Sequence, residues 1–286
     1  MLVKRTINMD TAHPTTHLSS FSGKSRRAPL ALADLLAAIK AWPLWTTLGW
    51  NDILQRYRRS LLGPFWLTAS MGIMVLALGV VYGRLFKTDL HDFLPYLSVG
   101  LIVWGYISSA VSEAGTLFTG SESYIKQIRL PFCLYVFRFM WSRIVIFAHN
   151  LVIYAIVLVT FQIWPGGAIL AALPGFAVLT INLASLSLLI GMLSARFRDI
   201  PQIISSLVQL SFFITPVMWK ADLLGPGSLI VMLNPFYHLL ELVRAPLLGN
   251  APSVQTALAA AIITLTNLSV STRFFVMFRH RISYWI

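Results

Sequence analysis

The stretch LQRYRRSLLGPFWL, residues 54–67, places Arg56, Arg58 and Arg59 directly before Gly63-Pro64 and the start of a long apolar run. This boundary is typical of a membrane edge, where cations stay beside anionic headgroups and apolar residues enter the hydrocarbon. The composition agrees, since 57% of the 286 residues are hydrophobic and only 11% are charged. The mean hydropathy of +0.74 is also far above that of a soluble domain. The sequence therefore predicts a membrane protein.

Six apolar runs are long enough to cross a membrane, because about 20 such residues cover a hydrocarbon core of about 30 Å. They occupy residues 64–85, 94–112, 131–161, 168–195, 201–219 and 253–278. We expect an all-α polytopic membrane protein with six transmembrane helices. Its parts are a flexible cytoplasmic tail at 1–28, an amphipathic helix at 29–60 and a six-span transmembrane domain at 61–286. Residues 1–30 are polar and lack the apolar core of a signal peptide.

The distribution of Lys and Arg predicts the orientation, because cytoplasmic loops are rich in these residues. With six spans both termini lie on one side of the membrane. That side receives sixteen cations: Lys4, Arg5, Lys24, Arg26, Arg27, Lys40, Arg56, Arg58, Arg59, Lys126, Arg129, Arg196, Arg198, Arg273, Arg279 and Arg281. The other side receives four, Arg84, Lys87, Lys220 and Arg244. We therefore expect cytoplasmic N and C termini.

The net charge of +12 has a competing explanation, a basic tail that binds RNA. The cations are instead spread over four segments that flank the membrane. This spread indicates a topology signal and no nucleic-acid partner.

Residues 29–60 are expected to lie on the inner leaflet as an amphipathic helix. The apolar residues of the first half recur at helical spacing, at Leu32, Leu35, Leu36 and Ile39. The second half carries Trp42, Trp45 and Trp50 among polar residues. Tryptophan prefers the headgroup level, which favours a helix in the plane of the interface over a seventh span. Pro43 should kink or split this helix.

Two connecting segments have unusual sequences. Between spans two and three, residues 121–128 can form a short cytoplasmic helix before Pro131 opens the next span. On the outer side, residues 220–250 are too apolar for a loop and too broken by Gly and Pro for one span. We expect an outer re-entrant hairpin of two short helices between spans five and six, with a simple surface loop as the alternative.

Polar residues inside the spans are functional candidates, because burying them in hydrocarbon is costly. One face of span three carries Arg143, Phe147, Asn150, Tyr154 and Phe161, and one face of span five carries Gln202, Ser206, Gln209 and Phe213. These faces must meet protein or water, as hydrogen bonds between helices or as the lining of a passage. No carboxylate lies in the middle of a span, which argues against a carrier coupled to protons or sodium.

The sequence also argues against cofactor sites. The lone Cys133 excludes an internal disulfide and a multi-cysteine metal site, and the six histidines form no HExxH motif. The segment FSGKS at 21–25 ends like a phosphate-binding loop, but Leu18 stands where GxxxxGK[ST] requires glycine. We expect no metal, no catalytic residue and no ATP site in this chain.

Five segments, taken in order, resemble the transmembrane subunits of type-2 ABC exporters for polysaccharides such as O-antigen, capsule and teichoic acid. They are QRYRRSLLGPFWLTASMGIMVLALGVVYGRLF (55–86), YLSVGLIVWGYISSAV (96–111), SYIKQIRLPF (123–132), SARFRDIPQIISSLVQLSFFITPVMW (194–219) and LNPFYHLLELVRAPLLG (233–249). The patterns RYRRSxLGPxW, ARFRDI and NPFYxLLExxRxPLL are specific when one chain contains all three. The resemblance runs from about residue 52 to the end, and Arg138, Arg143 and His149 depart from the family pattern.

The resemblance implies a half-transporter that forms a homodimer and binds two copies of a separate ABC ATPase subunit, which holds the Mg-ATP. The chain would be a transport subunit and not an enzyme. Residues 31–60 would be the interface helix. The coupling helix that docks on the ATPase would use Ser123, Tyr124, Ile125, Lys126 and Ile128. A lipid-linked polysaccharide would cross the bacterial cytoplasmic (inner) membrane through a channel between the protomers.

A polymer path needs walls that bind sugar rings weakly, and aromatic faces with amide groups meet that need. Because the family is expected to form its dimer seam from spans one and five, we expect the path at Trp66, Tyr82, Trp104, Gln202, Gln209 and Phe213. Arg56, Arg58 and Arg59 lie where the phosphate of the lipid end would arrive, and guanidinium groups suit phosphate. Packing and interface anchoring are the alternative roles of the first set, and a topology signal is that of the second.

Two other functions stay open at this point. A type-2 exporter of drugs or other lipids would share the architecture, although such relatives usually carry a large outer domain or a fused ATPase. A membrane enzyme that modifies glycans would need a compact acid, base or metal group. The residues that offer one are Asp89, His91 and Asp92.

Overall fold

The structure is a computed structural model that describes residues 27–58, 63, 65–85, 87, 89–225 and 227–286. The predicted tail at 1–28 therefore lies almost wholly outside the described residues. Every regular element in the described ranges is a helix, as the sequence predicts.

Of the helices that the structure describes, five are long and apolar enough to cross a membrane. They are α4 (Phe65–Leu85), α5 (Leu90–Glu113), α7 (Phe132–Phe161), α8 (Ala172–Arg196) and α12 (Val254–Phe278). The shortest, α4, has 21 residues and is about 31 Å long at 1.5 Å per residue, which matches the hydrocarbon core. The chain is a multi-pass membrane protein, and these helices confirm spans one to four and span six.

The predicted span five is shorter than expected. Helix α9 (Ile200–Ile214) has 15 residues, so it is about 22 Å long, and the chain leaves helical geometry at Thr215. The reason is Pro216, because the residue before a proline avoids the α region. The non-helical backbone is satisfied within the protein: the Tyr96 hydroxyl donates to the Trp219 carbonyl at 2.9 Å, and Arg244 donates to the Pro216 carbonyl at 2.6 Å.

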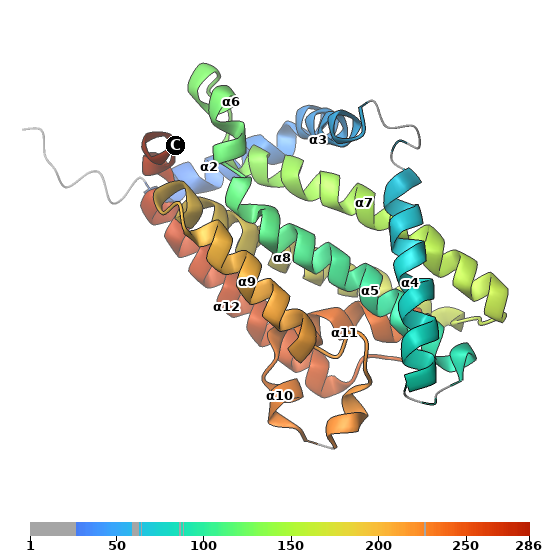
Figure 1. Ribbon diagram of the computed structural model, residues 1–286. Helices are drawn as coiled ribbons and strands as arrows, with labels where there is room; N and C mark the ends of the chain where they lie inside the picture. Colours follow the sequence, from blue (N-terminus) through green and yellow to red (C-terminus); the bar gives the residue numbers. More distant parts are fainter. Residues whose placement is uncertain (1–26, 59–62, 64, 86, 88, 226) are drawn as a thin grey trace, which may run out of the picture.

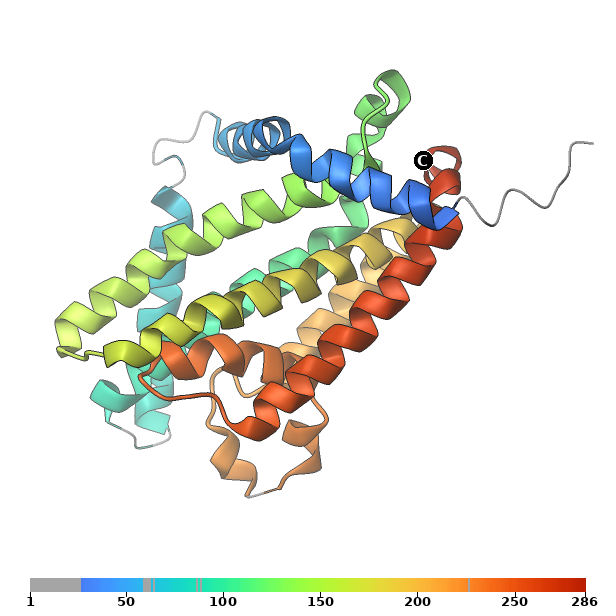
Figure 2. The same ribbon diagram turned by 180° about the vertical axis from the view of Figure 1, so that it is seen from behind.

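The helix α5 forms the centre of the bundle. It contacts α4, α7, α8, α9 and α11 (Pro235–Leu247), and Figure 1 shows α4 and α9 on either side of it. At one end of the bundle lie α2 (Arg27–Lys40), α3 (Trp42–Arg56), α6 (Glu122–Gln127) and the C-terminal α13 (Ile282–Trp285) (Figures 1 and 2). We call this the basic end, and the sequence predicts that it faces the cytoplasm.

Polar side chains join α8 to α12. The amide of Asn182 donates to Thr264 at 2.8 Å, and the amide of Asn267 donates to the backbone carbonyl of Asn182 at 2.9 Å. The Ser271 hydroxyl donates to the Ser185 carbonyl at 2.8 Å. Hydrogen bonds of this kind hold transmembrane helices together where no water competes.

The N-terminal segment is split, as Pro43 predicts. Helix α2 ends at Lys40, α3 begins at Trp42, and their axes are bent by 70°. The large apolar residues of α2 (Leu32, Leu35, Leu36 and Ile39) are exposed. A face of Ala31, Asp34 and Ala38 packs against the bundle instead. An outward stripe of large apolar residues is what a helix in the membrane interface requires.

The segment at the opposite end contains η4 (Ala221–Leu224), α10 (Leu229–Met232) and α11. Helix α11 packs against α8, α12 and α5. The guanidinium of Arg244 is buried, pairs with Glu241 at 2.5 Å and lies over the ring of Tyr96. The close approach of α11 to α8 depends on Gly175, because a Cβ at this position would collide with the Leu242 carbonyl. The re-entrant hairpin in the outer leaflet stays a prediction.

A buried carboxylate ties three separate helices together at the basic end. Asp34 on α2 accepts hydrogen bonds from the backbone N–H groups of Phe132 and Cys133, at 3.1 and 2.9 Å, and so caps the start of α7. The same carboxylate accepts from Arg279, directly after α12, at 2.9 and 2.7 Å. Asp34 therefore fixes α2 against the start of α7 and the end of α12.

We expect the Asp34→Ala variant to lower the free energy of unfolding by about 2–3 kcal/mol, because α7 loses its cap and Arg279 loses its partner. The midpoint of thermal unfolding of the purified protein in detergent measures this loss. Asp92→Ala removes an exposed carboxylate and is the matched control, with an expected cost of at most about 1 kcal/mol. Equal effects of the two variants would contradict this role of Asp34.

Candidate functional site

A polar cavity of about 250 Å³ lies at the basic end, between α3, the end of α5 and the first turns of α7. The charged or polar residues in its lining include Asp52, Arg56, Glu113, Tyr135, Arg138 and Arg143. We call this cavity the basic-end pocket. It brings three guanidinium groups and two carboxylates together at one edge of the membrane domain.

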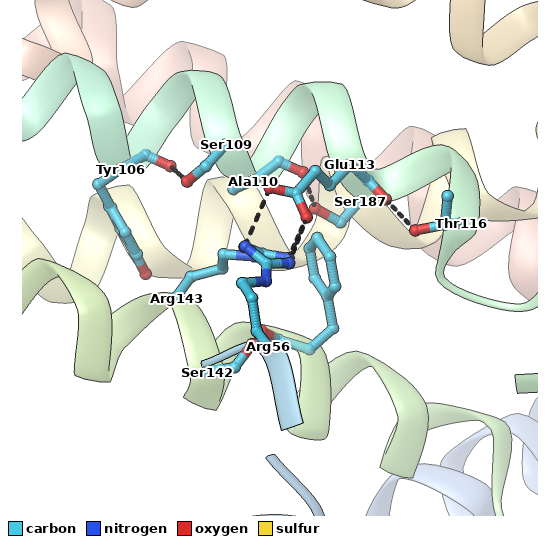
Figure 3. A network of polar contacts seen from close by, with 10 residues as sticks. Arg56, Tyr106, Ser109, Ala110, Glu113, Thr116, Ser142, Arg143 and Ser187 are labelled. Carbon is cyan, nitrogen blue, oxygen red and sulfur yellow. Dashed lines mark hydrogen bonds and ion pairs between the residues drawn. The ribbon is translucent and has the colours of Figure 1, made fainter. Parts of the chain in front are cut away.

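Glu113 is shared by two arginines from different helices (Figure 3). Arg143 on α7 donates to both carboxylate oxygens, at 3.1 and 2.7 Å, and Arg56 at the end of α3 donates to one of them at 2.9 Å. Glu113 is the last residue of α5, where the helix dipole adds partial negative charge and disfavours a carboxylate. The two guanidinium groups offset this, and the shared carboxylate joins α3, α5 and α7.

The third arginine links the pocket to α6. Arg138 forms a two-pronged pair with Asp52 on α3, at 2.7 and 2.5 Å. Its guanidinium also lies 5.2 Å from the ring centre of Tyr124 on α6. One side chain of α7 therefore contacts both the N-terminal segment and the short helix after α5.

The arginines predicted to receive a lipid phosphate have different positions. Arg56 lies in the basic-end pocket, with 46% of its side chain exposed. Arg58 follows α3 and is exposed. Arg59 lies outside the described residues.

The helix predicted for residues 121–128 is confirmed as α6, a projection beyond the basic end (Figures 1 and 2). Ser123, Tyr124 and Lys126 on α6 and Ile128 just after it are exposed, whereas Ile125 is half-buried. Lys126 pairs with Glu122 at 2.6 Å, and this hydrogen bond and charge lower the pKa of Glu122. The helix presents a mixed apolar and charged surface, and its docking role stays a prediction.

The residues predicted for the substrate path fall into two groups. On α4, Trp66 is exposed and Tyr82 is half-buried. On α9, the exposed residues are Gln202, Gln209 and Phe213. Trp104 differs, because it is buried inside the protomer between Phe212 and Phe236, with ring centres 5.8 Å away on both sides. The first group has the exposure that a path or a dimer seam requires, and Trp104 belongs to the packed interior.

The polar face of span three meets protein. Its members from Arg143 to Tyr154 are buried, and the Tyr154 hydroxyl donates to the Leu247 carbonyl on α11. The sequence reasoning noted Arg143 on this face and Glu113 near the end of its span, but it did not pair them or select Asp52 and Arg138. The available signal was two arginines in an apolar span, because such residues need carboxylate partners nearby.

Asp89 and His91, from the cluster that a glycan-modifying enzyme would need, form hydrogen bonds that support the local structure. Asp89 caps α5 by accepting from the His91 backbone N–H at 3.0 Å, and the His91 ring contacts the Phe161 carbonyl at 3.1 Å. Among the residues with described positions, no group of three His, Cys, Asp or Glu is arranged to hold a metal ion.

Comparison with known proteins gives one family. The model of the ABC-2 type transporter family matches residues 43–248, which are 206 of the 286 positions. The chain is 22% identical over 230 residues to the O-antigen export system permease protein RfbA of Myxococcus xanthus, covering 79% of this chain and 88% of that protein. It is 20% identical over 187 residues to a protein of the same name from Klebsiella pneumoniae, covering 65% and 72%.

The shared carboxylate gives a test of the pocket. We expect Glu113→Gln to lower the free energy of unfolding by about 2 kcal/mol, because the buried guanidinium of Arg143 loses its charged partner. Arg56→Gln should cost less than about 1 kcal/mol, since this pair is half-exposed. Thermal unfolding in detergent measures both variants. If the two variants were equally destabilised, the buried pair of Arg143 and Glu113 would contribute no more to stability than the half-exposed pair of Arg56 and Glu113.

Proposed function

The chain belongs to the ABC-2 type transporter family, and on that premise we propose that it is the membrane subunit of an ATP-driven exporter of a lipid-linked polysaccharide. The observation that carries this proposal is the similarity to an O-antigen export permease over 79% of the chain. The polymer would cross the bacterial inner membrane from the basic end to the opposite end.

Two exposed helices favour a homodimer. Among the described residues of α9, Val208 alone is buried, whereas Ile203, Leu207, Leu210 and Phe213 are all more than half exposed. Helix α4 likewise exposes apolar residues along its length, including Phe65, Ile73 and Val81. Apolar side chains on both helices are compatible with lipid, but the Gln202 and Gln209 amides on α9 need polar partners in a membrane. A second copy and a hydrated polymer would supply these partners, so we place the path between two protomers.

The projection of α6 supports a separate ATPase partner. Tyr124 and Ile128 expose apolar surface at an end of the molecule that carries many charges, and this pattern is typical of a docking site for another protein. Two copies of an ABC ATPase subunit, each with its own Mg-ATP, would dock on the two α6 helices of the dimer. The contact of Tyr124 with Arg138 would carry movement of α6 into the membrane domain.

The docking role predicts the effect of charge on α6. Replacing Tyr124, Ile125 and Ile128 with Glu should abolish copurification of the ATPase subunit, because charged groups cannot fill the apolar contact. Replacing the exposed Leu223 and Leu224 at the opposite end with Glu is the control and should leave copurification intact. Membrane insertion and thermal stability are measured for both variants. Retained copurification with the α6 variant would exclude the docking role.

The exporter role itself is tested in a bacterium that carries this gene. Deletion should remove a polysaccharide from the cell surface and leave lipid-linked polymer inside, and the wild-type gene should restore the surface signal. Immunoblots or sugar analysis of surface extracts measure the result. Unchanged surface polysaccharide together with altered sensitivity to drugs would instead favour an exporter of drugs or other lipids.

A further inference from the structure

Of the four buried polar atoms on α7 that have no hydrogen-bond partner among the described residues, three belong to side chains that line the basic-end pocket. They are the Tyr135 hydroxyl, one terminal nitrogen of Arg138 (Nη1) and the Nε of Arg143. Native proteins leave few buried donors unsatisfied, because each one has lost its hydrogen bonds to water. Three such atoms on side chains that line one cavity point to an occupant that accepts hydrogen bonds.

The charge of the pocket indicates the kind of acceptor. Three guanidinium groups face two carboxylates, so the pocket carries a net positive charge. A guanidinium group donates and never accepts, and its planar fork matches the oxygens of phosphate. The volume of about 250 Å³ is well above the roughly 30 Å³ share of one water molecule, so a phosphate group fits.

The pocket also has an open mouth and a closed floor. At the mouth, 46% of the Arg56 side chain and 39% of the Glu113 side chain are exposed. At the floor, Tyr135 is 2% exposed and Arg143 5%. An anion that enters past Arg56 would approach the α7 side chains that carry the unsatisfied donors.

We propose that the basic-end pocket binds a phosphate group, with Tyr135, Arg138 and Arg143 as its donors and Arg56 at its mouth. The identification of this group as the lipid phosphate of the exported molecule rests on the proposed function; the site itself rests on the cavity, its charge and its unsatisfied donors. Because Arg138 also contacts Tyr124, the occupant would touch the side chain that joins the pocket to α6.

The sharpest variant is Tyr135→Phe, which removes the unsatisfied hydroxyl and keeps the ring. The full-length chain is purified in detergent, and native mass spectrometry titrates three probes: a short polyprenyl phosphate, the polyprenol of the same length, and inorganic phosphate. Wild type should bind the polyprenyl phosphate at least about tenfold more tightly than the polyprenol. Tyr135→Phe should weaken polyprenyl phosphate binding about tenfold, as expected for one hydrogen bond to a charged group.

The controls separate binding from folding. The thermal midpoint of Tyr135→Phe should equal that of wild type, since the lost hydroxyl has no hydrogen-bond partner among the described residues. Tyr284→Phe removes a hydroxyl from an exposed tyrosine on α13 and should change neither stability nor binding. Arg143→Lys keeps the charge and removes the Nε donor, and it should weaken phosphate binding in the fraction that the thermal midpoint shows to be folded.

The probes also identify the source of the phosphate. Displacement of the polyprenyl phosphate by millimolar inorganic phosphate would assign the site to free phosphate, and a lack of displacement would assign it to a lipid headgroup. Equal binding of polyprenol and polyprenyl phosphate, or unchanged affinity of Tyr135→Phe, would overturn the phosphate site. If the wild-type gene still restored surface polysaccharide, that result would contradict the phosphate site and not the exporter function. Phosphate binding without restoration of surface polysaccharide would contradict the exporter function and not the phosphate site.

Discussion

Hydrocarbon offers no water to a polar group, and this constraint explains the arrangement of the polar atoms in the bundle. Where α9 ends at Ile214, the freed backbone carbonyls take donors from Tyr96 and Arg244. Where Asn182 and Ser185 lie within α8, side chains of α12 pair with them. The charge of Arg143 on α7 is matched by Glu113 on α5. Each of these contacts joins elements that are distant in the sequence, so the need to satisfy polar groups also positions the helices.

At the basic end the same need has a different consequence, because the carboxylates come from segments outside the spans as well as from their ends. Asp34 on α2 and Asp52 on α3 both pair with arginines of the membrane domain. The N-terminal segment is thus fixed by charge on its inner side, while large apolar residues of α2 cover its outer side. The pairs at Arg138 and Arg143 bring α3, α5 and α7 to one pocket, and Arg138 also contacts Tyr124 on α6, so a ligand at this place would lie beside the side chain that links the pocket to α6.

Much of the fold follows from the sequence, because the length of an apolar run and the positions of Pro are local properties. The five long spans, the split of the N-terminal segment near Pro43 and the helix at 122–127 were all predicted correctly. The early end of α9 had a local signal in Pro216, which the count of apolar residues outweighed. The burial of Trp104 and the pairing of Asp52 with Arg138 had none, since they depend on which helices become neighbours. Candidate site residues on exposed helices were therefore easier to select than those in the pocket.

The contact between Asp34 and Arg279 joins residues that are 245 positions apart. During synthesis α2 and α7 emerge long before the arginine does, so the carboxylate can cap α7 at an early stage, before its charge is paired with Arg279. The pairing with Arg279 has to wait until α12 has been synthesised, because this arginine follows that helix. The ion pair that joins α2 to the residue after α12 is therefore completed only at the end of synthesis.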